Sequence, residues 1–175
     1  MDKFEGYLQK LATVRNCIVI ISVKDTVGYW FNTKLQKNMQ ILGLKENLIN
    51  ELMVGYVAII RDGVVLYEKK DTDGVQYKDD IDYYTLSIKS QPYKKGNNAT
   101  IQIDGVDYAI NKRGFNIVLL DLNRGKVIDS LSFDTHVPHF DCTRTDRYLY
   151  NDDITRVDIK RLSNKIDLLL KILNK

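Results

Sequence analysis

Both histidines of the chain, His136 and His139, lie in one short polar stretch between Asp134 and Asp141. Imidazole and carboxylate groups bind zinc and other transition metals, so this stretch has the residue types of a metal site. However, Asp134 and Thr135 directly follow an apolar run, and short oxygen-bearing side chains at a strand end commonly bond to nearby backbone groups. Since no helix pattern supplies a further ligand, the stretch favours a structural turn, and we expect no bound metal.

The sequence lacks the motifs of known enzyme classes. Catalysis commonly requires a nucleophile beside a base, paired carboxylates in a cleft, or a glycine-rich phosphate loop. The chain contains no Gly-x-Ser-x-Gly, no Walker-type loop, and no cysteine with a plausible histidine partner. Residues 79–82, Asp-Asp-Ile-Asp, are acidic enough for calcium but lack EF-hand spacing. We therefore expect no enzymatic activity and no cofactor.

The composition is that of an ordinary soluble domain. A length of 175 residues with 44% hydrophobic residues fits a single folded unit with or without an appendage. The 26 basic and 23 acidic residues are too evenly mixed to indicate a nucleic-acid partner, which usually leaves a basic stripe. Cys17 and Cys142 fit neither a zinc spacing nor a disulfide framework, so both are expected to be free thiols.

The sequence shows no pattern of a targeting or membrane-spanning segment. Its N-terminus has no charged lead into an apolar signal core, and no stretch approaches the roughly 18 apolar residues of a membrane span. We therefore expect a soluble chain without a signal peptide or a membrane partner, either cytoplasmic or part of a virion.

The spacing of apolar residues predicts two helices in the N-terminal part of the chain. Residues 2–14 repeat at helical spacing and form a short amphipathic helix, which needs a surface to pack against. A second helix begins near Thr33, with Asn32 or Thr33 as its cap, and Gly43 can end it in the left-handed conformation.

Strand patterns fill most of the remaining chain up to about residue 133. The run 17–23 is continuously apolar, as in a strand buried on both faces, and residues 115–133 form a hairpin around an Asn-Arg-Gly turn. The alternation of apolar and polar residues elsewhere indicates a largely antiparallel sheet. Further strands are predicted at 56–60, 64–67, 84–88, 100–103 and 106–110, with a loop at 70–82.

The C-terminal segment, residues 152–175, has the pattern of a separate amphipathic helix. Its apolar residues follow the spacing of a coiled-coil seam. They are Ile159, Leu162, Ile166, Leu169 and Leu173. This helix either docks on its own domain, at residues 1–145, or makes the chain a homo-oligomer, and the sequence leaves both alternatives open.

Two blocks of the chain resemble the interleukin-like EMT inducer domain family, which includes the stem domain of protein O-mannose β-1,2-N-acetylglucosaminyltransferase. One block has Arg113-Gly114 before an apolar strand, then Phe133-Asp134-Thr135 and Pro-His-x-Asp at 138–141. The other has a strand into Lys24-Asp25, a helix ending in Leu-Gly, and an apolar strand at 56–60. The family has these blocks in the opposite order. The chain therefore resembles a circular permutant, which folded domains tolerate at surface loops.

The resemblance implies an α+β fold in which helices flank a sandwich-like core of two mostly antiparallel sheets, without a catalytic centre. In the glycosyltransferase stem it implies carbohydrate binding by the Arg of Arg-Gly, the Asp of Lys-Asp and a Trp-Arg pair. Arg113 and Asp25 occupy the first two positions here, whereas Leu52 and Met53 fall near the Trp-Arg positions. Half of that site is therefore missing.

Three aromatic residues are candidate replacements, Tyr29, Trp30 and Tyr93. Sugars need a flat apolar ring against their C–H face alongside polar groups for their hydroxyls. Each candidate role has a structural alternative. Arg113 and Asp25 could form a plain ion pair, and Trp30 could be a core or helix-staple residue.

The sequence thus predicts a non-enzymatic carbohydrate-binding module for a cell-surface or cell-wall polysaccharide. A phage tail fibre or baseplate, or a bacterial surface-polysaccharide protein, would suit such a module. The alternative is a structural assembly or protein-interaction domain that binds no sugar. Loss of the Trp-Arg positions favours this alternative.

Overall fold

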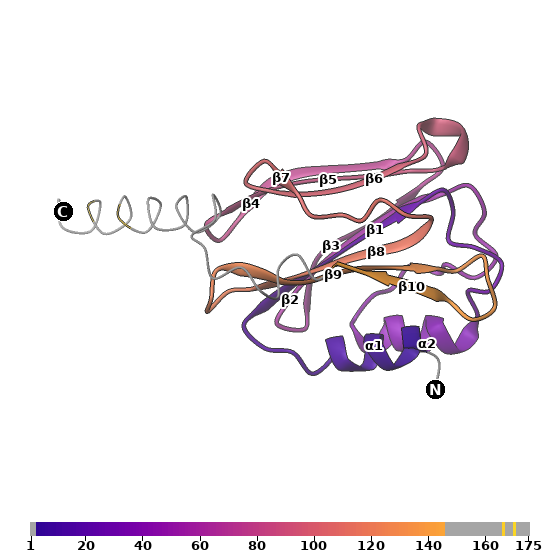
Figure 1. The fold of residues 1–175 in the computed structure, drawn as a ribbon, viewed down its shortest axis with the longest axis horizontal. Helices are drawn as coiled ribbons and strands as arrows, with labels where there is room; N and C mark the ends of the chain where they lie inside the picture. The colour runs from indigo at the N-terminus through magenta and orange to yellow at the C-terminus, as the bar shows by residue number, and fades with distance from the viewer. Residues whose placement is uncertain (1–2, 146–165, 167–169, 171–175) are drawn as a thin grey trace.

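Residues 3–145 form three layers, namely two α-helices, a six-stranded sheet and a four-stranded sheet (Figure 1). The computed structural model describes these residues together with residues 166 and 170. The predicted C-terminal helix at 152–175 therefore lies outside the described residues, apart from Ile166 and Leu170, which are helical. Helices α1 (Lys3–Leu11) and α2 (Thr33–Ile41) cover one face of the larger sheet, and the smaller sheet covers the other.

The strands are β1 (Cys17–Lys24), β2 (Gly55–Arg61), β3 (Val64–Asp71), β4 (Val75–Ile81), β5 (Tyr84–Gln91), β6 (Asn98–Ile103), β7 (Val106–Asp107), β8 (Gly114–Asp121), β9 (Lys126–Asp134) and β10 (Asp141–Arg144), with a 3-10 helix η1 (Tyr93–Lys95) after β5. The larger sheet has the order β10-β9-β8-β1-β2-β3 and the smaller sheet β4-β5-β6-β7. All neighbouring strands are antiparallel. The predicted α+β class, with two antiparallel sheets in a sandwich-like core, is confirmed.

Strand β1 is apolar at almost every position because both of its faces are buried. Side chains alternate across a strand, so Val19 and Ile21 point into the core beneath the helices, whereas Ile18 and Ile20 point into the core between the sheets. Strands β2 and β8, which flank β1, share this double burial. The prediction of a strand buried on both faces is confirmed.

Helix α2 begins and ends where the sequence predicted. The side-chain oxygen of Asn32 accepts hydrogen bonds from the backbone N–H groups of Lys34 at 3.0 Å and Leu35 at 3.1 Å, which makes Asn32 the N-cap. Gly43 follows the helix with a φ of +87°, in the left-handed region that suits glycine. Local sequence signals therefore set both ends of this helix.

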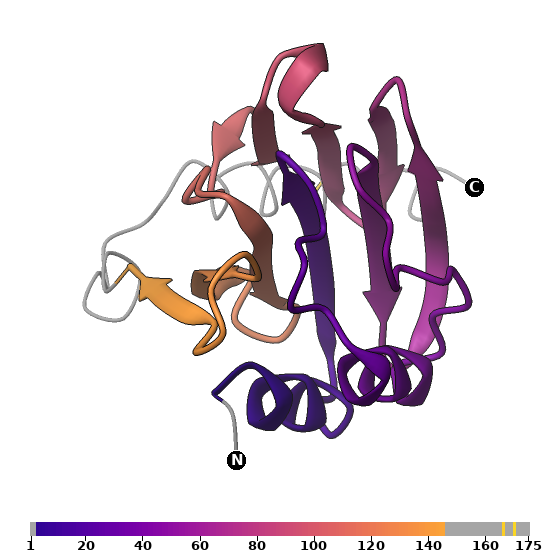
Figure 2. The same ribbon diagram turned by 90° about the vertical axis from the view of Figure 1, so that its right-hand side faces the viewer.

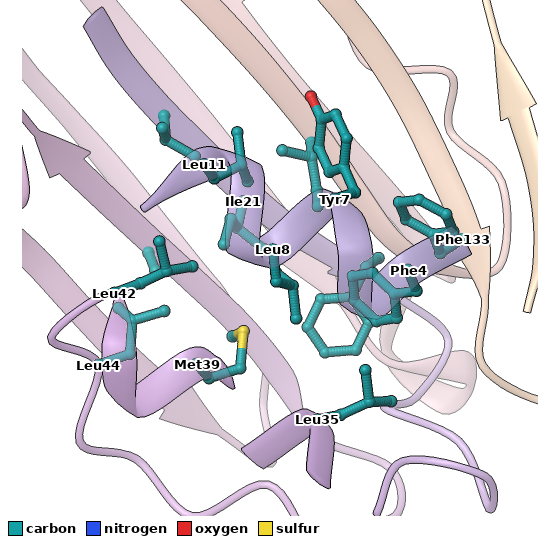
Figure 3. Packing of buried hydrophobic residues seen from close by; sticks show 14 of the residues in the cluster. Phe4, Tyr7, Leu8, Leu11, Ile21, Leu35, Met39, Leu42, Leu44 and Phe133 are labelled. Carbon is teal, nitrogen blue, oxygen red and sulfur yellow. The ribbon is translucent and has the colours of Figure 1, made fainter. Parts of the chain in front are cut away.

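Aromatic rings organise the core beneath the helices. Phe4 of α1 stacks on Phe133 of β9 with ring centroids 4.4 Å apart, and the buried Met39 of α2 lies in the same core (Figure 3). Phe31 stacks on Phe115 of β8 at 5.5 Å. Both helices thus bury one face against the larger sheet.

The prediction of a loop at 70–82 is wrong, because residues 75–81 form strand β4. Val75 and Ile81 are buried at the two ends of this strand, while a lysine and two aspartates in its second half face solvent. The ring of Tyr77 packs against that of Tyr67 on β3, with centroids 4.6 Å apart. β4 is an edge strand, and edge strands often carry charges because these discourage pairing with other chains. Its polar composition therefore resembles that of a loop.

Buried serines join the two sheets near the end of β1. The Ser22 hydroxyl donates to the Lys89 carbonyl of β5 at 2.6 Å. The Ser90 hydroxyl donates to the Val23 carbonyl and accepts from the Tyr56 backbone N–H at 2.7 Å. Both serines are fully buried, so these bonds hold β5 against β1 and β2 at this end of the sandwich.

Candidate functional site

Antiparallel pairing brings three strand ends together. Strand β8 runs opposite to both of its neighbours, so its start lies beside the end of β1, where Lys24 pairs with Gly114, and beside the end of β9. Asp25 directly follows β1, Arg113 directly precedes β8, and Asp134 is the last residue of β9. They consequently lie at the same end of the larger sheet, on the right in Figure 1.

The smaller sheet contributes a further segment to this end. The backbone of Asp25 forms a bridge with Pro92, and the Tyr93 N–H donates to the Asp25 carbonyl at 3.1 Å. Helix η1 therefore lies against the end of β1, and Figure 2 looks directly onto it and the neighbouring loops. We call this region the loop end, comprising residues 24–31, 92–98, 111–114 and 134–141.

Thr135 connects the segments of the loop end. Its side chain is fully buried, and its hydroxyl donates a hydrogen bond to the Val27 carbonyl. Its own carbonyl accepts from the Trp30 backbone N–H at 3.2 Å. The loop after β1 is thereby fixed to the turn after β9.

Two glycines allow this close approach. A Cβ on Gly114 would lie 2.2 Å from the Phe133 carbonyl oxygen, and one on Gly28 would lie 2.5 Å from that of Thr135. Both glycines also have positive φ, at +87° and +95°. Any other residue at either position would meet both a backbone overlap and an unfavourable φ.

Arg113 forms its ion pair with Asp134. Its Nε and Nη2 groups donate to the Asp134 carboxylate at 3.1 and 2.8 Å. The alternative of an ion pair with Asp25 does not hold for the described chain, in which the Asp25 carboxylate has no hydrogen-bond or ion-pair partner. Asp25 instead acts on Arg113 at longer range, through its charge.

Both members of the pair are held in their charged forms. Hydrogen bonding to Asp134 raises the pKa of Arg113 above its ordinary value, partial burial opposes this, and the charges of Asp134 and Asp25 add to the rise. Partial burial raises the pKa of Asp134, but hydrogen bonds from Arg113 and from the His136 backbone outweigh it, so this pKa lies below its ordinary value. The pair therefore stays ionised at neutral pH.

Three aromatic side chains are exposed at the loop end. The exposed fractions are 75% for Tyr29, 49% for Trp30 and 59% for Tyr93. The ring of Tyr29 meets that of His136 edge-on, with centroids 6.0 Å apart. Trp30 is thus anchored through its backbone to Thr135 while its side chain is half-exposed, which does not fit the alternative of a core residue.

Leu52 and Met53 lie in the loop before β2, and both are exposed. The neighbouring Glu51 carbonyl accepts a hydrogen bond from the Thr26 hydroxyl at 3.3 Å, which brings this loop next to the loop end. The two residues at the expected Trp-Arg positions therefore border the candidate site, but they add only apolar surface to it.

The loop end has the chemistry of a recognition surface. The Asp25 carboxylate can accept hydrogen bonds, and the Nη1 group of Arg113 can donate them, since neither has a partner in the part of the chain that the structure describes. The exposed rings of Tyr29, Trp30 and Tyr93 belong to the same end of the molecule. Such a combination suits a ligand with hydroxyl groups and apolar C–H faces.

The described residues show no arrangement for metal binding or membrane crossing. Among residues 3–145, 166 and 170, no three histidine, cysteine, aspartate or glutamate side chains are placed to hold a metal ion. Within the described residues, neither Cys17 nor Cys142 takes part in a disulfide bond, as predicted. None of the helices in these ranges is long and apolar enough to span a membrane.

No protein-family model, curated protein or solved structure matches the chain. Membership of the interleukin-like EMT inducer family therefore stays a prediction from the two sequence blocks.

The sequence did not indicate how Asp134 and Thr135 organise the loop end, because they were interpreted as turn residues and as part of the family motif. A signal was available in the hairpin. Residues equally distant from a hairpin turn face each other, so Arg113 and Gly114 at one end of the hairpin are expected near Asp134 and Thr135 at the other.

Replacing Gly114 should lower the free energy of unfolding more than replacing a glycine of similar backbone conformation. Gly105 has a φ of +81° with nothing within 4 Å of its Cβ position, so Gly105→Ala should cost about 1–2 kcal/mol of unfolding free energy. Gly114→Ala adds the backbone overlap and should cost about 1–3 kcal/mol more. Chemical denaturation of both variants measures this difference, and equal losses would contradict the described packing.

Loss of the Asp134 carboxylate should destabilise the protein in a pH-dependent way. A lowered folded-state pKa means that the stabilisation is complete above the unfolded-state value of about 3.9 and is lost as the pH falls through the folded value. Asp134→Asn should therefore cost about 1 kcal/mol at pH 7 and nothing at strongly acidic pH. Unfolding measured from pH 7 downward tests this, with Asp80→Asn on the exposed face of edge strand β4 as a control that should change the free energy of unfolding little.

Proposed function

We propose that residues 1–145 form a non-enzymatic carbohydrate-binding module whose binding surface is the loop end. One observation carries the proposal. In the described part of the chain, every aromatic side chain among the exposed large hydrophobic residues belongs to the loop end, namely Tyr29, Trp30 and Tyr93. The same region holds the unpartnered Asp25 carboxylate and the Arg113 guanidinium, so rings and hydrogen-bonding groups occur together as sugar recognition requires.

The two polar groups are also the ones that the family resemblance selects. Arg113 and Asp25 stand at the positions by which the similar glycosyltransferase stem is expected to bind sugar, and we propose that the chain is a permuted member of that family. The bidentate pair with Asp134 restrains the Arg113 side chain before any ligand arrives. Restraint of this kind lowers the entropic cost of binding.

Self-association through the C-terminal segment is the second part of the proposal. Ile166 and Leu170 are helical and lie four residues apart, on one helix face, yet they are 55% and 50% exposed. Apolar side chains in this state suit contact with another copy, and linked copies raise the avidity of weak sugar sites. A phage tail fibre, a baseplate or a bacterial surface-polysaccharide protein would use such an assembly. An assembly that binds no sugar is the competing function.

Binding of the intact chain to a glycan array tests the module. Arg113→Ala and Asp25→Ala should each weaken binding at least about tenfold, because each removes a hydrogen bond to a charged group. Arg61→Ala is the matched control, since the Arg61–Asp82 pair has side-chain exposures of 45% and 24%, against 45% and 25% for Arg113–Asp134. This control should bind like the unaltered chain. A blank array would reject sugar binding and leave the assembly function.

Sedimentation tests self-association. The intact chain should sediment as an oligomer, and a version that ends at Asn151 should sediment as a monomer, because it lacks the apolar seam. Circular dichroism of the shortened chain provides the control that the domain remains folded. A monomeric intact chain would rule out association through this segment.

A further inference from the structure

The charges of the loop end are only partly paired. Lys95 bonds Asp73 at 2.8 Å, and Arg113 bonds Asp134, so these charges are balanced locally. Three further cations, Lys24, Lys94 and Lys112, have no carboxylate partner within the described residues.

Hydrogen bonds near the starts of β8 and β6 bring the segments that carry these three lysines to the same end of the molecule. The Lys24 ammonium donates to the Asn111 carbonyl at 3.0 Å, which leaves two of its N–H groups for other acceptors. Lys112 follows Asn111, whose side chain donates to Asn98 at 2.8 Å and so ties this segment to the chain after η1. Lys94 lies within η1, directly after Tyr93.

The negative charges nearby do not balance these lysines. Asp25 lies among them, and no cationic side chain of the described chain binds its carboxylate. Asp141, also exposed, begins β10, which is separated from β8 by the whole of β9. The segments around Asp25 and Tyr93 thus carry three lysines and one aspartate without an ion-pair partner among the described residues, although the chain as a whole is nearly balanced, with 26 basic and 23 acidic residues.

We propose that the ligand of the loop end is an anionic saccharide, one whose sugar rings carry carboxylate or phosphate groups. This inference rests on the proposed carbohydrate-binding function and narrows its ligand class. Rings such as Tyr93 contact the apolar face of a sugar, and the adjoining Lys94 reaches an acidic substituent of the same or the next unit. Lys112 and Lys24 meet further charges of the polymer from the β8 side.

A neutral saccharide would gain less from this arrangement, because its hydroxyl groups can accept hydrogen bonds from ammonium groups but carry no charge. Exposed ammonium groups are strongly hydrated, and they attract an anionic polymer while it approaches and while it is bound. Asp25 remains available for a hydroxyl group, because a single carboxylate among three lysines does not repel a polyanion overall. The excess of cations therefore selects between acidic and neutral glycans, whereas the rings select for sugars.

Matched glycan pairs on one array test the inference with the full chain. Each anionic glycan is presented beside its neutral form, either carboxylated with carboxyl-reduced or phosphorylated with dephosphorylated. We expect binding to the anionic members only, and the two kinds of pair identify whether carboxylate or phosphate is recognised. The double variant Lys94→Gln with Lys112→Gln should bind about tenfold more weakly, since two exposed charge contacts are lost.

The control variant Lys10→Gln with Lys78→Gln removes two exposed lysines that lie outside the loop end, one in the last turn of α1 and one in β4, and should bind normally. Equal binding of anionic and neutral members would overturn the inference while leaving carbohydrate binding intact. An equal loss in the control variant would also overturn it, because attraction would then depend on total charge. A blank array with every pair would reject carbohydrate binding itself.

Discussion

The contact of buried Thr135 with the backbones of Gly28 and Gly114 is the constraint on which the loop end depends. It fixes the loop after β1, the start of β8 and the turn after β9, which are distant in sequence, at separations that leave no room for a Cβ. Trp30 and Arg113 stand on two of these segments. Their relative position is therefore set by backbone packing, and little order has to be created when a ligand binds.

The smaller sheet is tied to the same region by a different device. Ser22 and Ser90 form buried hydrogen bonds between β1, β2 and β5, and the Asp25 bridge to Pro92 continues this connection past the strand ends. Buried hydrogen bonds have defined geometry, so they fix the alignment of the two sheets where hydrophobic contact alone would allow sliding. As a result, η1 is positioned against the end of β1.

Sequence patterns predicted the parts of the fold that depend on local or periodic signals. The cap at Asn32 and the double burial of β1 are of this kind. They did not predict β4, because an edge strand needs few apolar residues and its charges resemble a loop. The Arg113–Asp134 pair also went unrecognised, since it depends on the register of the hairpin, which a single-residue shift in pairing would change.

The loop end differs from the opposite end of the sandwich in its exposed aromatic rings, and not in having an ion pair. The Arg61–Asp82 pair matches the Arg113–Asp134 pair in exposure, with its Nε group 3.1 Å from the carboxylate, and an exposed pair of this kind contributes at most about 1 kcal/mol to stability at either end. What distinguishes Arg113 is its surroundings. A structural role for its pair with Asp134 is compatible with recognition, because the pair uses the Nε and Nη2 groups of the guanidinium and leaves the Nη1 group without a partner in the described chain.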